Sequence, residues 1–163
     1  MLRATLWYRG VPRDYAKEFR AELTEALLAL GEYWHDRFAP KHFTIAGEKE
    51  YDYYPRHPSY SRYKAKRFGH RRPLVLTGDL ERMVLGVARV SATSQSASVV
   101  MRGPKYLYAY RKDLPGGRPS QGDKAAELTA VTPAELNELA GVFERHLADA
   151  LARLNVTETR SFQ

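Results

Sequence analysis

The 163-residue sequence contains no cysteine. This absence excludes a disulfide framework, a thiolate metal site and a cysteine nucleophile, so any chemistry must come from oxygen and nitrogen groups. A chain without thiols fits a reducing compartment, and we expect it to be made in a cytoplasm.

Long hydrophobic runs are also missing. No apolar stretch approaches the ~18 residues of a membrane-spanning helix, and Met1 to Tyr8 lack the apolar stretch of a signal peptide. We therefore expect neither a membrane protein nor an exported one. Hydrophobic residues make up 44% of the chain and charged residues 28%, which is typical of a folded globular domain, and the length predicts one domain.

Acidic residues are the minority charge: 26 Lys and Arg stand against 19 Asp and Glu, a net charge of +7. The excess is local, because ten basic and only three acidic residues lie between Arg37 and Arg72. Such a patch suits an anionic partner, either a nucleic acid or the acidic surface of another protein. A solvated basic loop without a partner is the simpler alternative.

Two stretches have helical periodicity. Between Asp14 and Pro40, apolar residues recur at steps of three and four, which predicts a helix of roughly 24 residues. Thr132-Pro133-Ala134-Glu135 predicts the start of a second helix, with Thr132 as N-cap and Glu135 closing a capping box. We expect both helices to cover the sheet with a shared core of Tyr15, Phe19, Leu23, Leu27, Leu30, Phe143, Leu147 and Leu151.

Short strands are expected between and before these helices. Alternating apolar residues predict a strand over Leu2–Tyr8, and β-branched runs on either side of Ser94-Gln95 predict a hairpin of Val84–Thr93 with Ser96–Arg102. Tyr106–Tyr110 fits a strand or a helical turn, and Ala125–Val131 a last strand. Thr77 is a candidate N-cap for a short helix through Met83.

The elements together predict an α+β fold: an antiparallel sheet of about four strands covered by two long helices. We expect a single domain over residues 1–154, with a flexible loop at 111–122 and a polar tail at 155–163.

Residues 41–72 show no period. Aromatic side chains alternate there with basic ones, and Pro55 and Pro58 interrupt any long element, so we expect an extended arm with one helical turn around Ser59–Lys66. Its charge indicates that it does not bury itself and is poorly ordered in an isolated subunit. Tyr and Arg are enriched in protein interfaces. The candidate partner-binding residues are Tyr60, Arg62, Tyr63, Arg67, Arg71 and Arg72.

No pattern argues for catalysis. The five histidines show no zinc-type i, i+4 pair, no Gly-x-Ser-x-Gly elbow is present, and Gly116-Gly117 is no phosphate loop. We expect a protein that is not an enzyme and holds no metal or cofactor. Non-specific nucleic-acid binding remains the alternative, because aromatics interleaved with Lys and Arg, as in Tyr60–Phe68, could stack bases and hold phosphates.

The run Tyr63–Leu80 resembles a stretch of tailed-bacteriophage neck and tail-completion proteins. In these proteins a Tyr/Lys/Arg-rich segment leads into a Pro-Leu-x-x-Thr-Gly-x-Leu turn, here Pro73, Leu74, Thr77, Gly78 and Leu80. The preceding helix and the later Pro104-Lys105-Tyr106 are similar too, so that the resemblance extends from Asp14 to Leu154.

The resemblance implies a virion structural protein made in the host cytoplasm. Its subunits would form a homo-oligomeric ring, with six copies as the expected number, at the head-tail junction or the upper end of the tail. Neighbouring connector and tail proteins would be its partners, and genomic DNA a passing contact.

Overall fold

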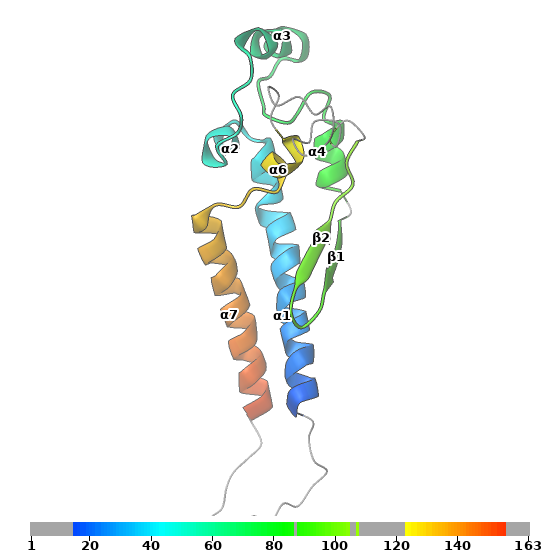
Figure 1. The fold of residues 1–163 in the computed structure, drawn as a ribbon, viewed down its shortest axis with the longest axis vertical. Coiled ribbons are helices and arrows are strands. Elements are labelled where there is room, and N and C mark those ends of the chain that lie inside the picture. The colour runs from blue at the N-terminus through cyan, green and yellow to red at the C-terminus, as the bar shows by residue number, and fades with distance from the viewer. Residues whose placement is uncertain (1–14, 87, 105–106, 108–122, 156–163) are drawn as a thin grey trace, which may run out of the picture.

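The computed structural model describes residues 15–86, 88–104, 107 and 123–155. Over these residues the fold is α+β, with several helices and one antiparallel sheet (Figure 1). Four predictions lie wholly or mostly outside the described residues: the strands over Leu2–Tyr8 and Tyr106–Tyr110, the loop at 111–122 and the tail at 155–163.

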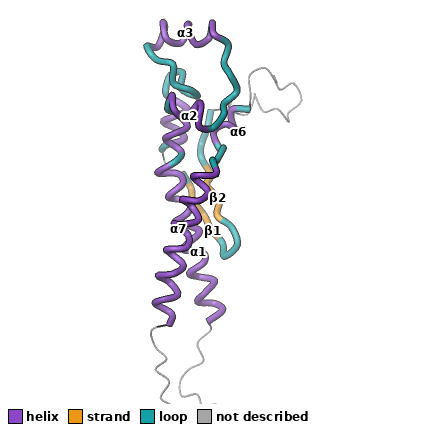
Figure 2. The backbone as a smooth tube through the Cα atoms, turned by 90° about the vertical axis from the view of Figure 1, so that its left-hand side faces the viewer, coloured by secondary structure: helices purple, strands orange, loops and turns teal. Residues whose placement is uncertain are grey.

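Helices α1 (Tyr15–Arg37) and α7 (Pro133–Asn155) lie side by side (Figures 1 and 2). The capping box of α7 forms as predicted: the Thr132 backbone N–H donates to the Glu135 carboxylate at 3.1 Å, and the Glu135 N–H donates to the Thr132 hydroxyl at 3.2 Å. Where the two helices meet, a cluster of buried side chains comprises Trp34, Phe38, Ala39 and Leu139.

The predicted core is only partly correct. Leu23, Leu27, Leu30, Phe143 and Leu147 are half-buried, whereas Phe19 and Leu151 are 37% and 39% exposed, so for these two the prediction is wrong. The side chain of Tyr15 lies outside the described part. A two-helix contact covers only a narrow strip of each helix, and the predicted core did not include the residues that are buried: Ala26, Trp34, Leu139, Val142 and Ala150.

Strands β1 (Arg89–Ala92) and β2 (Ala97–Val100) form the predicted hairpin with shorter strands, since Val84 lies in a helix; Arg89 is opposite Val100 and Ala92 opposite Ala97. The hairpin packs on α1 at Gly31, where an added Cβ would lie 2.7 Å from Val90 Cγ1. In the described residues the sheet has two strands, and α1 alone among the helices packs on it. The expectation of four strands covered by two helices is therefore wrong for this part of the chain.

A second core lies beyond the end of α1. There, the short helix η1 (Ala39–Phe43) is in contact with three helices: α2 (Ile45–Glu50), α4 (Asp79–Val84) and α6 (Lys124–Leu128). The buried apolar side chains of this core are Phe43, Val75, Leu80, Val84, Leu107 and Leu128.

Two local predictions around this core are wrong. Residues 124–128 form a helix and not a strand, because Asp123 caps the N–H groups of Ala125 and Ala126 at 3.0 Å each. Helix α4 begins after Gly78, whose φ of 88° favours glycine, and not with Thr77 as its cap.

Helix α3 (Pro58–Phe68) lies at the end of the molecule opposite the free ends of α1 and α7 (Figures 1 and 2). It is longer than the predicted single turn, with His57 as N-cap, Pro58 in the first turn and Gly69 in the left-handed conformation at its end. Residues 41–72 thus contain three helical elements. They also contribute buried side chains such as His42, Phe43 and Tyr53, so the expectation that this segment does not bury itself is wrong.

Candidate interaction surface on helix α3

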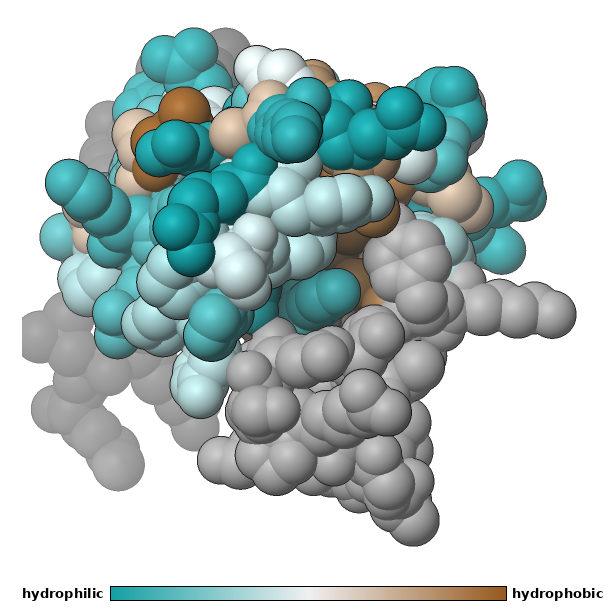
Figure 3. Space-filling model, turned by 90° about the horizontal axis from the view of Figure 1, so that it is seen from above, coloured by the Kyte–Doolittle hydropathy of each residue, from teal (hydrophilic) through white to brown (hydrophobic). Residues whose placement is uncertain are grey.

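The candidate site is the outward face of α3. Tyr60 and Tyr63 are 40% and 56% exposed, and Arg62, Lys66 and Arg67 are exposed as well. The inward positions Ser61, Lys64, Ala65 and Phe68 are buried or half-buried. Because exposed and covered residues alternate with the helical period, one continuous face of α3 carries both tyrosines and the three cations. Seen from this end, the molecule is mostly hydrophilic (Figure 3).

Lys64 fixes the orientation of this face. Its side chain is only 4% exposed, its Nζ donates a hydrogen bond to the Arg72 carbonyl, and Nζ lies 5.8 Å from the centre of the Tyr60 ring. Burial lowers the pKa of Lys64 to about 8, because a buried ammonium loses its hydration. Lys64 therefore ties α3 to the chain that follows it and leaves the other basic residues of the helix facing solvent.

Arg72 has a different position from the other predicted site residues. Its Nε donates to the Phe43 carbonyl at 3.0 Å, and its guanidinium forms an ion pair with Glu81. These bonds connect the turn after α3 to η1 and α4. The structure thus brings Tyr60, Arg62, Tyr63 and Arg67 together on α3, places Arg71 exposed just beyond it, and gives Arg72 bonds within the fold.

The basic segment divides into paired and unpaired charges. Arg56 pairs with Glu127, Lys41 lies 3.5 Å from Glu135 and 3.8 Å from Glu50, and Arg72 pairs with Glu81. Within the described residues, a second group of cations forms no ion pair with a carboxylate: Arg37, Lys49, Arg62, Lys66, Arg67 and Arg71, the last four of which lie on α3 or just after it. The positive charge that is available to a partner is therefore concentrated on α3 and the residues that follow it.

A buried polar network holds the base of this end of the molecule. The His42 ring stacks on Tyr51 at 3.8 Å, and His42 Nδ1 is hydrogen-bonded to the Tyr53 hydroxyl at 2.6 Å. The Tyr51 hydroxyl donates to Glu135 at 2.5 Å, and so joins the segment before α3 to the start of α7. Burial lowers the pKa of His42 to about 4, so the ring is neutral at physiological pH.

Sequence reasoning missed this network. Tyr51 and Tyr53 belong to the segment that was predicted not to bury itself, yet they are 8% and 4% exposed. Two tyrosines that are two residues apart in a basic segment do not form a pattern that predicts burial.

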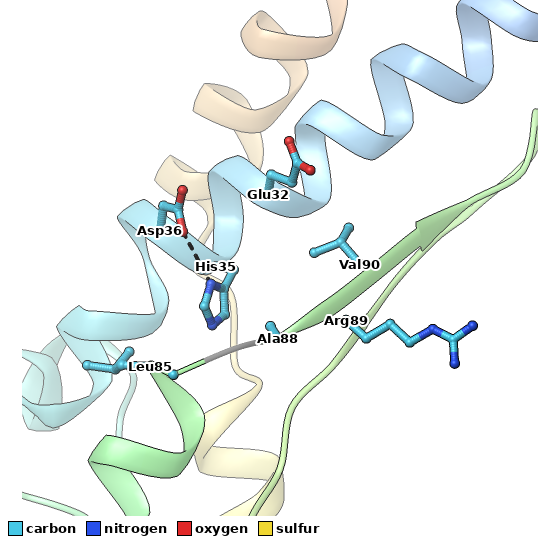
Figure 4. A pocket seen from close by; sticks show the side chains of 8 residues that line it. Glu32, His35, Asp36, Leu85, Ala88, Arg89 and Val90 are labelled. Atoms are coloured by element: carbon cyan, nitrogen blue, oxygen red, sulfur yellow. Dashed lines mark hydrogen bonds and ion pairs between the residues drawn. The ribbon is translucent and has the colours of Figure 1, made fainter.

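A depression lies where the hairpin meets α1 (Figure 4). It is open to solvent and is lined by Glu32, His35, Asp36 and Arg89, among others. His35 Nε2 is 2.9 Å from the Val84 carbonyl, and Nδ1 is 3.2 Å from Asp36. Both ring nitrogens of His35 are thus engaged in contacts within the fold.

Two other kinds of site are absent from the described ranges. In that part of the chain no three His, Asp or Glu side chains are placed to hold a metal ion. None of its helices combines the length and apolar character needed to cross a membrane.

Comparison with known proteins gives no match. No family model matches the sequence, and no curated protein and no solved structure matches it either.

Proposed function

We propose that the chain is a non-enzymatic structural subunit of a tailed-bacteriophage virion. It would form an oligomeric ring, with six copies expected, at the head-tail junction or the upper end of the tail. This ring would join or complete the tail around the path of the DNA. The proposal starts from the resemblance of residues 63–80, in which α3 leads through Pro73 and Leu74 into the turn at Gly78.

The observation that carries the proposal is the outward face of α3. This helix packs against no other helix or strand of the described chain, yet it is held in place by the Lys64 and Arg72 bonds. A helix fixed at one end of a molecule, with Tyr60, Tyr63 and unpaired arginines facing outward, has the composition of an interface anchor.

Arginine and tyrosine also indicate the kind of partner. An arginine binds a carboxylate in a planar, two-bond geometry, and a tyrosine buries a large ring while its hydroxyl stays hydrogen-bonded. We therefore infer that the partner of α3 is an acidic surface of a neighbouring connector or tail protein, or of another subunit.

The same unpaired cations favour one competing function, non-specific binding of nucleic acid. Multi-phosphate contacts would make such binding fall steeply as salt rises. DNA inside a ring channel could also contact this face in passing.

The test is charge reversal on α3, with Arg62→Glu and Arg67→Glu in one variant. The matched control reverses Arg20 and Arg102, two exposed arginines elsewhere in the described chain that have no ion pair there. Both variants change the net charge equally. Each is scored for joined heads and tails in a complementation assay, and for DNA binding in a salt titration.

We expect the α3 variant to abolish joined particles and the control variant to leave their yield unchanged. Normal particle yield from the α3 variant, together with a loss of salt-dependent DNA affinity, would instead establish the nucleic-acid function. Normal yield with unchanged DNA binding would remove α3 from either role.

A further inference from the structure

Helix α1 carries a face made of acidic residues. Glu18, Glu22, Glu25, Glu32 and Asp36 follow one another at steps of four, three, seven and four. These steps place all five on one side of a 3.6-residue helix, and no Lys or Arg of α1 falls in the same register.

This side of α1 lies between its two packing partners. Tyr33 and Trp34 face α7, through the Tyr33–Glu138 hydrogen bond and the cluster with Leu139, and Gly31 faces the hairpin. The acidic face occupies the remaining arc.

Within this face the acids differ in availability. Glu22 forms an ion pair with Arg153 of α7. By contrast, Glu25, Glu32 and Asp36 are exposed and make no ion pair with a Lys or Arg of the described chain. The exposed part that a partner could reach therefore runs from Glu25 to Asp36.

The basic face of α3 and the exposed acidic stretch from Glu25 to Asp36 have opposite charge and similar length. At a rise of 1.5 Å per residue, the distance from Glu25 to Asp36 is about 16 Å, and α3 is about 16 Å long. They cannot meet within one molecule, because α3 lies at one end and packs against no other helix, whereas these acids lie along the shaft of α1 (Figure 2).

We propose that α3 of one copy docks on the acidic face of α1 of a second copy. The inference rests on the proposed ring function and names its subunit contact. Arg62 and Arg67 would pair with Glu25 and Glu32, with Tyr63 buried between them.

Such a contact joins two different surfaces, so a pair of copies keeps one free α3 and one free α1 face. Contacts of this kind generate a closed ring when the rotation closes and a filament when it does not. Because the attraction is between exposed charges, it weakens at high salt, where the Debye length falls to about 3 Å at 1 M.

The experiment uses the full chain in a charge-swap design, with sedimentation velocity at low and high salt. The first variant carries Arg62→Glu and Arg67→Glu, and the second carries Glu25→Lys and Glu32→Lys. A control variant reverses Glu144 and Asp149, two exposed acids of α7 that form no ion pair in the described chain.

We expect the native chain and the control to self-associate at low salt and to dissociate at 1 M salt. Each swap variant alone should raise the dissociation constant by about 100-fold, because like charges then face each other. Mixing the two variants should restore association, since the acidic α3 of one then meets the basic α1 face of the other. Restoration by mixing cannot come from unfolding of either variant.

Three results would overturn the inference. They are a native chain that stays monomeric at every salt concentration, association that the Glu25 and Glu32 reversals leave intact, and a mixture that fails to associate. The proposed function is judged separately, because particle joining scores α3 whatever its partner is. Loss of joining with unchanged self-association would place α3 on a different virion protein.

Discussion

Glu135 connects two parts of the fold that are distant in sequence, and removing its carboxylate gives a sharp test of the structure. The side chain is 2% exposed. One of its oxygens accepts the Thr132 N–H in the capping box, and the other accepts the Tyr51 hydroxyl and lies 3.5 Å from Lys41 Nζ.

The expected cost of Glu135→Ala follows from these bonds. Loss of the capping interaction costs about 1 kcal/mol. Loss of a charged acceptor leaves the buried Tyr51 hydroxyl without a partner and costs about 2 kcal/mol more. The Lys41 pair adds little, because that lysine is well exposed. We expect the free energy of unfolding to fall by about 3 kcal/mol in a urea titration.

Two companion variants make the result interpretable. Glu144→Ala, at an exposed position of the same helix, should change the free energy of unfolding by less than about 0.5 kcal/mol. Combining Glu135→Ala with Tyr51→Phe should cost less than the two single changes together, because the hydroxyl that loses its partner is then absent. Strict additivity, or a loss below about 1 kcal/mol for Glu135→Ala, would refute the reasoning.

Two further predictions concern His42 and Gly31. His42 stays neutral in the folded chain to about pH 4 but gains a proton near pH 6.5 when unfolded, so the unfolded state binds more protons between these values. His42 alone should lower the free energy of unfolding by about 3 kcal/mol as the pH drops from 6.5 to 4. In urea titrations of His42→Gln, this contribution to the pH dependence should be absent. Gly31→Ala should destabilise by about 1 to 2 kcal/mol despite the better helix propensity of alanine, because its Cβ would lie 2.7 Å from Val90 Cγ1. Val90→Ala should relieve this loss in thermal unfolding, and an additive double variant would contradict the assigned contact.

What the sequence predicted correctly is mostly local. The capping box at Thr132 and the hairpin around Ser94-Gln95 are each specified within a few residues, and both are confirmed. The second role of Glu135, as acceptor for Tyr51, joins residues far apart in the sequence and left no local pattern.

The basic segment was misread because its helices are short. Elements of five, six and eleven residues give too few turns for an apolar period to emerge. Pro58 predicts an interruption of any long element, yet it stands in the first turn of α3, where a proline is favoured. A similar signal, Asp123 before a run of helix formers, could have identified α6.

The candidate site was predicted as a set of residues but not as a surface. The choice of Tyr60, Arg62, Tyr63 and Arg67 rested on composition, and the helix is what places them on one face. Arg72 was chosen for the same reason, but in the structure it bonds to Phe43 and Glu81 within the fold. These two residues come close to Arg72 only when the chain folds, so the sequence could not indicate them.

The most direct test of the central proposal is the location of the protein in the particle. Tailed-phage virions purified from cells that produce the chain would be examined by mass spectrometry, and by electron microscopy after labelling of a tagged chain. The account predicts a fixed copy number per virion, with six expected, and a single label at the junction of head and tail or at the upper end of the tail. Virions that lack the protein, or a label spread over the head or along the tail, would contradict it.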